Sequence, residues 1–320
     1  PQSAKKLPHQ REKETETLVD TTIISYSKLT EEELIYMLKT PRPHEEISKI
    51  AAELEKRLTD IIPLSNDKIY NDSWAVIIGI NEYKSEPLKY AVNDALEIQK
   101  MLIDKFGFNN DNIRLLIDNE ATYSSIREAL YEIGALAKDN DRILVYFAGH
   151  GTQITTKSGM NIGYLIPSEG NLNKPLLGGI PMDDIFRMCQ FSGSKHLLFL
   201  MDACYSGLMA ERSRGIDISR DKDGYIPTVA NLPAWQIITA GNGEQKVIEG
   251  DEWQHSAFTY NLLKALNDWD ADVYKDGYIT ATELGEYLKI TVSDVTQGRQ
   301  TPQSERIKAS EDGEFIFFPE

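Results

Sequence analysis

Two unbroken apolar runs constrain the fold of this chain more than any other feature. Residues 142–147 read RILVYF and residues 197–201 read LLFLM, and each run stops abruptly at small or polar residues. Short apolar runs without alternation are typical of strands buried on both faces, as in parallel sheets covered by helices. We therefore expect both segments to be central strands of an α/β sheet.

Other apolar segments alternate with helical patterns and predict the remainder of the sheet. This alternation implies right-handed crossovers, with helices on both faces. The predicted fold is therefore α/β, with a mainly parallel sheet of about six strands. Further strands are expected at 72–81, 113–117, 235–240 and 314–318, helices at 87–106, 122–137, 183–191, 255–267 and 283–292, and a short hairpin arm at 164–167.

A histidine and a cysteine follow the two central strands. His150 lies in AGHG after the first run, and Cys204 lies in DACYSG after the second. Ligands bind at the carboxyl ends of strands in open α/β sheets. Alone, His150 is most simply a loop histidine and Cys204 a small buried side chain. Together, at two strand ends beside glycines, they favour a nucleophile with its base.

The motifs YFAGHG and DACYSG together resemble the caspase-like cysteine peptidases. In detail they are more similar to bacterial orthocaspases and metacaspases than to animal caspases. The resemblance runs from about Trp74 to about Phe318 and implies the caspase-hemoglobinase fold. It also implies a catalytic dyad of Cys204 and His150, with the backbone N–H groups of Gly151 and Cys204 binding the oxyanion. It implies no third catalytic residue.

Two acidic residues predict specificity for a basic side chain before the scissile bond. Asp202 lies two residues before Cys204, and in an extended strand the two side chains point the same way. Asp94 matches a metacaspase position that supplies a second acid to this pocket. Two carboxylates favour Arg over Lys because the guanidinium fork can engage both. The alternatives are a surface helix residue for Asp94 and a strand-end turn former for Asp202.

The resemblance divides the chain into an N-terminal extension, which lies outside it, and a peptidase domain. We expect residues 1–70 to be a disordered stretch followed by two short helices, at 31–39, with Thr30 and Glu33 as a capping box, and at 44–59. The resemblance implies a caspase-like domain at residues 71–320, with a large segment at 71–207, a linker at 208–233 and a small segment at 234–320.

The linker shows no periodicity, and long connections of this kind are usually functional or disordered. Caspase-like peptidases often mature by cleavage here. We therefore expect autoprocessing, or cleavage by an upstream activating protease, and the alternative is a solvated loop that is never cut. The basic residues that could precede the cut are Arg212, Arg214, Arg220 and Lys222.

Calcium is left open by the sequence. Asp183 and Asp184 resemble an acidic pair in calcium-dependent metacaspases, but they are equally a negatively charged first helical turn. Residues 272–283 resemble an EF-hand loop, yet Tyr274 stands where an oxygen ligand is needed. We therefore favour a turn leading into a helix capped at Thr280, and we expect no required cofactor.

The net charge, the apolar runs and the cysteine count limit the possible partners and location of the protein. A net charge of −16 argues against nucleic acid or an anionic membrane as a partner. No apolar run approaches the roughly 20 residues that span a bilayer. Two cysteines, Cys189 and Cys204, make no disulfide framework and favour a cytoplasmic location. The expected partners are protein or peptide substrates with Arg or Lys at the cleavage site. The alternative function is an adaptor that acts through its N-terminal helices.

Overall fold

The structure is a computed structural model of the 320-residue chain. It describes residues 30–40, 42–43, 46–51, 69–204, 224–241, 245–307 and 311–319. The chain divides into two compact units, Pro1–Pro63 and Leu64–Glu320.

In the first unit, helix α1 (Glu31–Leu38) begins at a capping box. The Thr30 N–H donates to Glu33 Oε2 at 2.7 Å, and the Glu33 N–H donates to Thr30 Oγ1 at 3.2 Å. The predicted start of this helix is therefore confirmed. Residues 46–51 are helical, whereas the rest of the predicted second helix and residues 1–20 lie outside the described residues.

The second unit is built on a six-stranded sheet in the order β12-β8-β7-β3-β1-β2. All neighbours pair in parallel except β12 and β8, which are antiparallel. The two apolar runs are adjacent central strands, and the predicted α/β fold is confirmed. The strands are β1 (Ser73–Gly79), β2 (Ile113–Ile117), β3 (Arg142–Ala148), β7 (His196–Cys204), β8 (Ala234–Gly241) and β12 (Gln303–Arg306).

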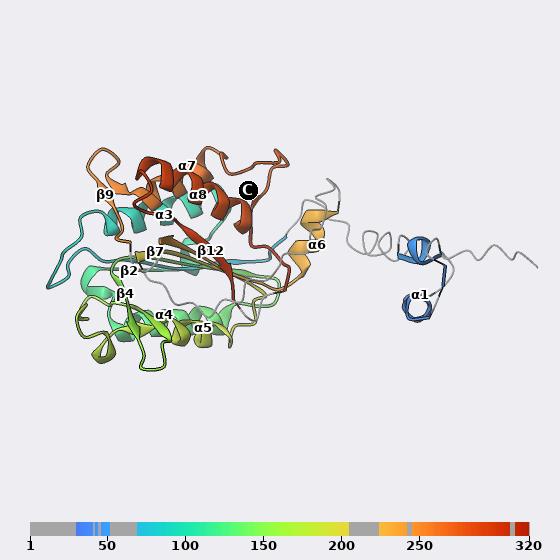
Figure 1. The fold of residues 1–320 in the computed structure, drawn as a ribbon, viewed down its shortest axis with the longest axis horizontal. Helices are drawn as coiled ribbons and strands as arrows, with labels where there is room; N and C mark the ends of the chain where they lie inside the picture. Colours follow the sequence, from blue (N-terminus) through green and yellow to red (C-terminus); the bar gives the residue numbers. More distant parts are fainter. Residues whose placement is uncertain are drawn as a thin grey trace, which may run out of the picture. The chain divides into compact units, whose positions relative to one another are not determined.

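Helices cover both faces of this sheet (Figure 1). One face is covered by α3 (Ala91–Phe106), α7 (Ala257–Asn267) and α8 (Ala281–Val295), and the other by α4 (Tyr123–Leu136) and α5 (Met182–Cys189). Because the side chains of a strand alternate between the two faces of a sheet, β7 contributes side chains to two hydrophobic cores. Leu198 and Leu200 join the first core, whereas Leu197 and Phe199 join the second. This double burial explains why the run in the sequence is apolar throughout.

Two predictions about elements were wrong. The sixth strand of the sheet is the polar β12, not residues 314–318, from which β13 (Ile316–Phe317) pairs with β11 (Ile279–Thr280). An edge strand has one neighbour and needs no apolar run. In addition, the linker predicted to lack structure contains helix α6 (Tyr225–Asn231), which has only seven residues and so shows little periodicity. Residues 205–223 of the linker lie outside the described residues.

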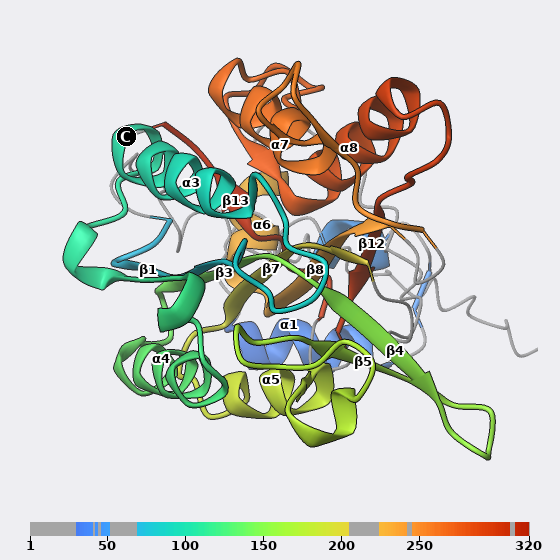
Figure 2. The ribbon, with the colours of Figure 1, turned by 90° about the vertical axis from the view of Figure 1, so that its left-hand side faces the viewer.

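Smaller sheets border the carboxyl ends of the central strands. Strands β4 (Gly151–Thr155), β5 (Asn161–Leu165) and β6 (Ile180–Pro181) form one antiparallel sheet, whose β4–β5 hairpin projects from the domain (Figure 2). Of the hairpin arm predicted at 164–167, only residues 164 and 165 belong to this hairpin, at the end of β5. Strands β9 (Glu249–Gly250) and β10 (His255–Ser256) form a second small sheet just before α7. Within the described residues, no helix has the length and apolar character that crossing a membrane requires.

Candidate functional site

The strands β3 and β7 bring the proposed dyad to one edge of the sheet. Ala148, the last residue of β3, pairs with Asp202 of β7, and the Gly149 N–H donates to the Asp202 carbonyl at 3.3 Å. His150 and Cys204 each lie two residues beyond this pair. Their main chains are therefore neighbours at the carboxyl edge, as the strand pattern predicts. The side chain of Cys204 lies outside what the structure describes.

The imidazole of His150 is oriented by the main chain. Its Nε2 lies 2.6 Å from the carbonyl oxygen of Glu86. A carbonyl only accepts hydrogen bonds, so Nε2 carries the hydrogen. In the neutral ring this leaves the lone pair on Nδ1, which makes Nδ1 the atom able to accept a proton.

Tyr83 fixes the backbone of the same histidine. Its hydroxyl group accepts a hydrogen bond from the His150 N–H at 3.0 Å and donates to the Ile166 carbonyl at 2.9 Å. The two rings lie with their centroids 4.5 Å apart. Burial raises the pKa of Tyr83 well above its usual range, so the hydroxyl group stays protonated. Backbone and ring of His150 are thus both held by neutral groups.

A cavity of about 260 Å³ lies beside the imidazole of His150. A Cβ atom on Gly149 would meet the Tyr83 hydroxyl oxygen at 2.5 Å, so this border of the cavity requires glycine. Gly151, predicted to help bind the oxyanion, lies at the same border and begins β4. The lining residues are Glu86, Pro87, Leu88, Gly149, His150, Gly151, Leu172, Lys246 and Val247.

The two predicted acids lie together on the face covered by α3 and α7. Asp94 is 1% exposed and Asp202 is 2% exposed. Ser256 joins them, because its N–H donates to Asp94 Oδ2 at 3.1 Å while its hydroxyl group donates to Asp202 Oδ2. Thr259 adds a second hydroxyl donor to Asp202 Oδ2 at 2.6 Å. The surface alternative for Asp94 is therefore wrong.

The predicted alternation of side chains between Asp202 and Cys204 is interrupted in β7. The pairing of β7 with β8 has a register irregularity between Met201 and Cys204. A bulge breaks the strict alternation of side chains along a strand. The spacing of two residues therefore does not fix the direction of the Cys204 side chain relative to that of Asp202.

Burial raises the pKa of both carboxyl groups. Burial, with the nearby charge of Asp94, raises the pKa of Asp202 to about 7 despite its two hydroxyl donors. Burial also raises the pKa of Asp94, although His255 and Ser256 donate to it. Within the described part of the chain, Asp202 Oδ1 is buried without a hydrogen-bond partner. A buried acceptor without a hydrogen-bond partner would be satisfied by a ligand that supplies a hydrogen-bond donor.

Several residues of this site were not predicted from the sequence. Tyr83 and Glu86 hold His150 from more than sixty residues upstream, and His255 contacts Asp94 from 161 residues downstream. Such contacts leave no local pattern. Ser256 did leave one, because a serine just before an apolar helical stretch is a helix-capping signal. Its side chain accepts from the Thr259 N–H at 2.8 Å and caps α7.

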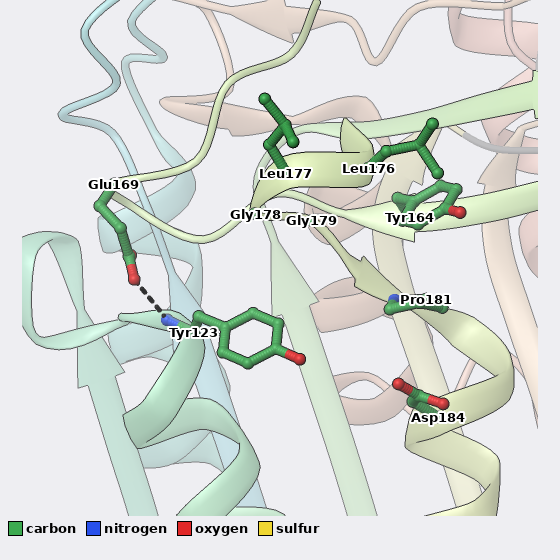
Figure 3. Close-up of a pocket in the computed structure, with 9 residues that line it drawn as sticks. All are labelled: Tyr123, Tyr164, Glu169, Leu176, Leu177, Gly178, Gly179, Pro181 and Asp184. Carbon is green, nitrogen blue, oxygen red and sulfur yellow. Dashed lines mark hydrogen bonds between the residues drawn. The ribbon is translucent and has the colours of Figure 1, made fainter. Parts of the chain in front are cut away.

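Of the two acids considered for calcium, Asp184 lines a different cavity, of about 540 Å³ (Figure 3). Asp184 faces this cavity and lies 3.4 Å from Arg127, while Asp183 is exposed. The carboxylate of Glu169, on the opposite side in Figure 3, accepts the Tyr123 N–H at 2.9 Å. Among the residues described, no group of three or more His, Cys, Asp or Glu is arranged to hold a metal ion. Calcium dependence stays a prediction.

The loop that resembled an EF-hand is a turn before a capped helix, as favoured. Asp272 accepts the N–H groups of Asp276 at 3.2 Å and Gly277 at 3.0 Å. Thr280 and Glu283 then form a capping box at the start of α8. The oxygens of Asp272 thus close the turn on itself.

Comparisons with known proteins find relatives among the metacaspases. Metacaspase-7 of Arabidopsis thaliana is 32% identical over 152 residues, which cover 44% of this chain and 36% of that protein. Metacaspase-6 of the same plant is 30% identical over 185 residues, covering 52% and 48%. This chain therefore matches less than half of the length of either relative.

A crystal structure of protein GSU0716 from Geobacter sulfurreducens has the same fold, with a TM-score of 0.52 at 17% identity. The alignment covers 74% of this chain and 93% of that one. A family model described as the caspase domain, a peptidase family, matches residues 72–312. Since this match takes in every strand of the central sheet, the chain belongs to the caspase-domain peptidase family.

Proposed function

We propose that this chain is a cysteine endopeptidase in which Cys204 is the nucleophile and His150 is the base. The observation that carries the proposal is that His150 and Cys204 each lie two positions after a residue of the Ala148–Asp202 pair, which joins the adjacent parallel strands β3 and β7. The hydrogen bond from His150 Nε2 to the Glu86 carbonyl supports it, because it leaves Nδ1 free of hydrogen in the neutral ring. Membership of the caspase-domain family supports the same chemistry.

In the proposed mechanism, His150 Nδ1 accepts the thiol proton and the sulfur of Cys204 attacks the substrate carbonyl carbon. The backbone N–H groups of Gly151 and Cys204 stabilise the oxyanion that forms. The imidazolium of His150 then protonates the leaving amine as the peptide bond breaks. Water, with its proton accepted by His150, hydrolyses the thioester and regenerates the thiol. These steps require no metal or organic cofactor.

The proposed specificity is for Arg, and less strongly for Lys, before the scissile bond. Asp94 and Asp202 are buried side by side, and Asp202 Oδ1 is an acceptor without a partner within the described residues. A guanidinium group supplies both the positive charge and the donors that such a pair of acids lacks. An acidic side chain would bring a third negative charge into a largely desolvated place.

Maturation by cleavage in the linker follows from the same specificity. Arg212, Arg214, Arg220 and Lys222 lie in the linker, outside the described residues. Exposed loops without core residues are the usual sites of proteolysis. We propose that this cleavage is autoprocessing or is carried out by an upstream protease. Intact-mass measurement of wild type beside Cys204→Ala checks for autoprocessing, since only the wild type should be cut when no other protease is present. We also propose a cytoplasmic location.

Paired fluorogenic peptides that differ only in Arg or Asp before the scissile bond test the activity. Wild type should hydrolyse the Arg peptide, and Cys204→Ala and His150→Ala should each lower hydrolysis on the order of a thousandfold or more. Asp202→Ala should remove the preference for Arg. Preference for the Asp peptide, or near wild-type turnover in His150→Ala, would refute the proposal. Repeating the assay in chelator and in added calcium shows whether calcium regulates the enzyme.

A further inference from the structure

His255 is a titratable neighbour of the acidic pair that the proposed mechanism does not use. Its Nδ1 lies 2.5 Å from Asp94 Oδ1, and its side chain is 16% exposed. A carboxylate cannot donate, so Nδ1 carries a hydrogen whether the ring is neutral or charged. The imidazole thus occupies one oxygen of a buried acid at the proposed specificity site.

The β9–β10 hairpin holds His255 in this place. His255 pairs with Gly250, and the next residue, Ser256, pairs with Glu249. The carboxylate of Glu249 accepts the N–H groups of Lys89 and Tyr90 at the start of α3, which carries Asp94. Because the hairpin is attached to α3 in this way, the imidazole and the Asp94 carboxylate keep a fixed relative position.

The hydrogen bonds leave one carboxylate oxygen unoccupied in the pair. Asp94 Oδ1 accepts from His255, and Asp94 Oδ2 accepts from the Ser256 N–H. Asp202 Oδ2 accepts from the hydroxyl groups of Ser256 and Thr259. Of the four carboxylate oxygens of Asp94 and Asp202, only Asp202 Oδ1 has no partner among the described residues.

We propose that His255 is a specificity-determining residue, which occupies Asp94 and leaves Asp202 as the single acceptor for a basic substrate side chain. This inference rests on the proposed function. One free oxygen serves an ammonium group nearly as well as a guanidinium group, because neither can then bind bidentately. The planar fork of Arg gains its advantage only when it bridges two acids. His255 therefore lowers the ratio of kcat/KM for an Arg substrate to that for a Lys substrate.

The test compares kcat/KM for two peptides that differ only in Arg or Lys before the scissile bond. In His255→Ala and in His255→Phe, which keeps a ring of similar size without a donor, Asp94 Oδ1 becomes available. The ratio of kcat/KM for Arg to that for Lys should rise roughly tenfold, the effect of one added charge-assisted hydrogen bond. His255→Asn is the matched control, since its amide places a donor near the position of Nδ1 and should keep the wild-type ratio.

A third peptide with citrulline, the uncharged isostere of Arg, separates specificity from general damage. A merely structural role for His255 would change hydrolysis of all three peptides together and leave their ratios unchanged, which would overturn the inference. Thermal melts identify any variant that fails to fold, and His255→Phe then decides in place of His255→Ala. If wild type cleaves neither basic peptide, the proposed function fails instead, so the two failures are distinguishable.

Discussion

At the scale of single residues, the hydroxyl group of Tyr83 joins the main chain of His150 to that of Ile166. In Tyr83→Phe both backbone groups lose their partner, so the free energy of unfolding should fall by about 1–3 kcal/mol. Turnover of an Arg peptide should also fall, because the proposed base is held less firmly. Urea unfolding and kcat check this. Tyr131→Phe, at a side chain 62% exposed, should change neither quantity. Wild-type values in Tyr83→Phe would contradict the expectation.

Asp202 should make the folded domain less stable as the pH rises. Its pKa is raised from the ordinary 3.8 to about 7 in the fold, chiefly by burial. Between these values the unfolded chain gives up the proton that the folded chain keeps. The free energy of unfolding should therefore decrease from about pH 4 to about pH 7 and then level off. Urea unfolding across this range should show a shallower decline in Asp202→Asn, and an unchanged profile there would contradict the expectation. Asp183→Asn, at an exposed residue, is the control.

The chemistry-bearing residues differ in how far the sequence could reveal them. His150 and Cys204 follow apolar runs, so local pattern alone brings them to one edge of the sheet. Asp202 was singled out by its spacing from Cys204, whereas Asp94 was recognised only through a resemblance, because nothing local pairs a residue on α3 with one on a strand more than 100 positions later. His255 and Tyr83 act through contacts set by the tertiary fold, which no local periodicity records.

At the scale of elements, the capped start of α8 offers a direct measurement. Thr280→Ala removes the side-chain acceptor for the Glu283 N–H, and the free energy of unfolding should fall by about 1 kcal/mol. The same change at the exposed Thr155 should have little effect on stability. Because the oxygens of Asp272 already accept loop N–H groups, adding calcium should leave the stability difference between Thr280→Ala and wild type unchanged. A calcium-dependent difference would restore the EF-hand interpretation.

Elements were predictable where burial imposed a pattern. Strands β3 and β7 are buried on both faces and stand out as apolar runs, whereas β12 contains only polar residues because it lies at the sheet edge. The apolar run near the C-terminus was real, but Phe315 and Phe317 are buried in the core beneath α3 and α8 and not in the central sheet. Helix α6 is anchored by Ile226 and Val229, too few positions to reveal a helical period.

At the scale of the whole peptidase unit, cleavage of the linker should leave the two segments associated. Strands β7 and β8 come from different segments and pair in register from His196↔Ala234 to Met201↔Thr239. Helices α7 and α8 follow the linker, yet they complete the core over strands that precede it. Separating the segments would expose side chains such as Leu198 and Leu262, each worth about 1.5–3 kcal/mol when fully buried.

A site for a highly specific protease, inserted between residues 212 and 220 of Cys204→Ala, allows a single cut without autoprocessing. The cut protein should elute from size exclusion with the uncut control and show the sum of both fragments in native mass spectrometry, and should separate only in urea. Fragments that part in native buffer would contradict a shared core.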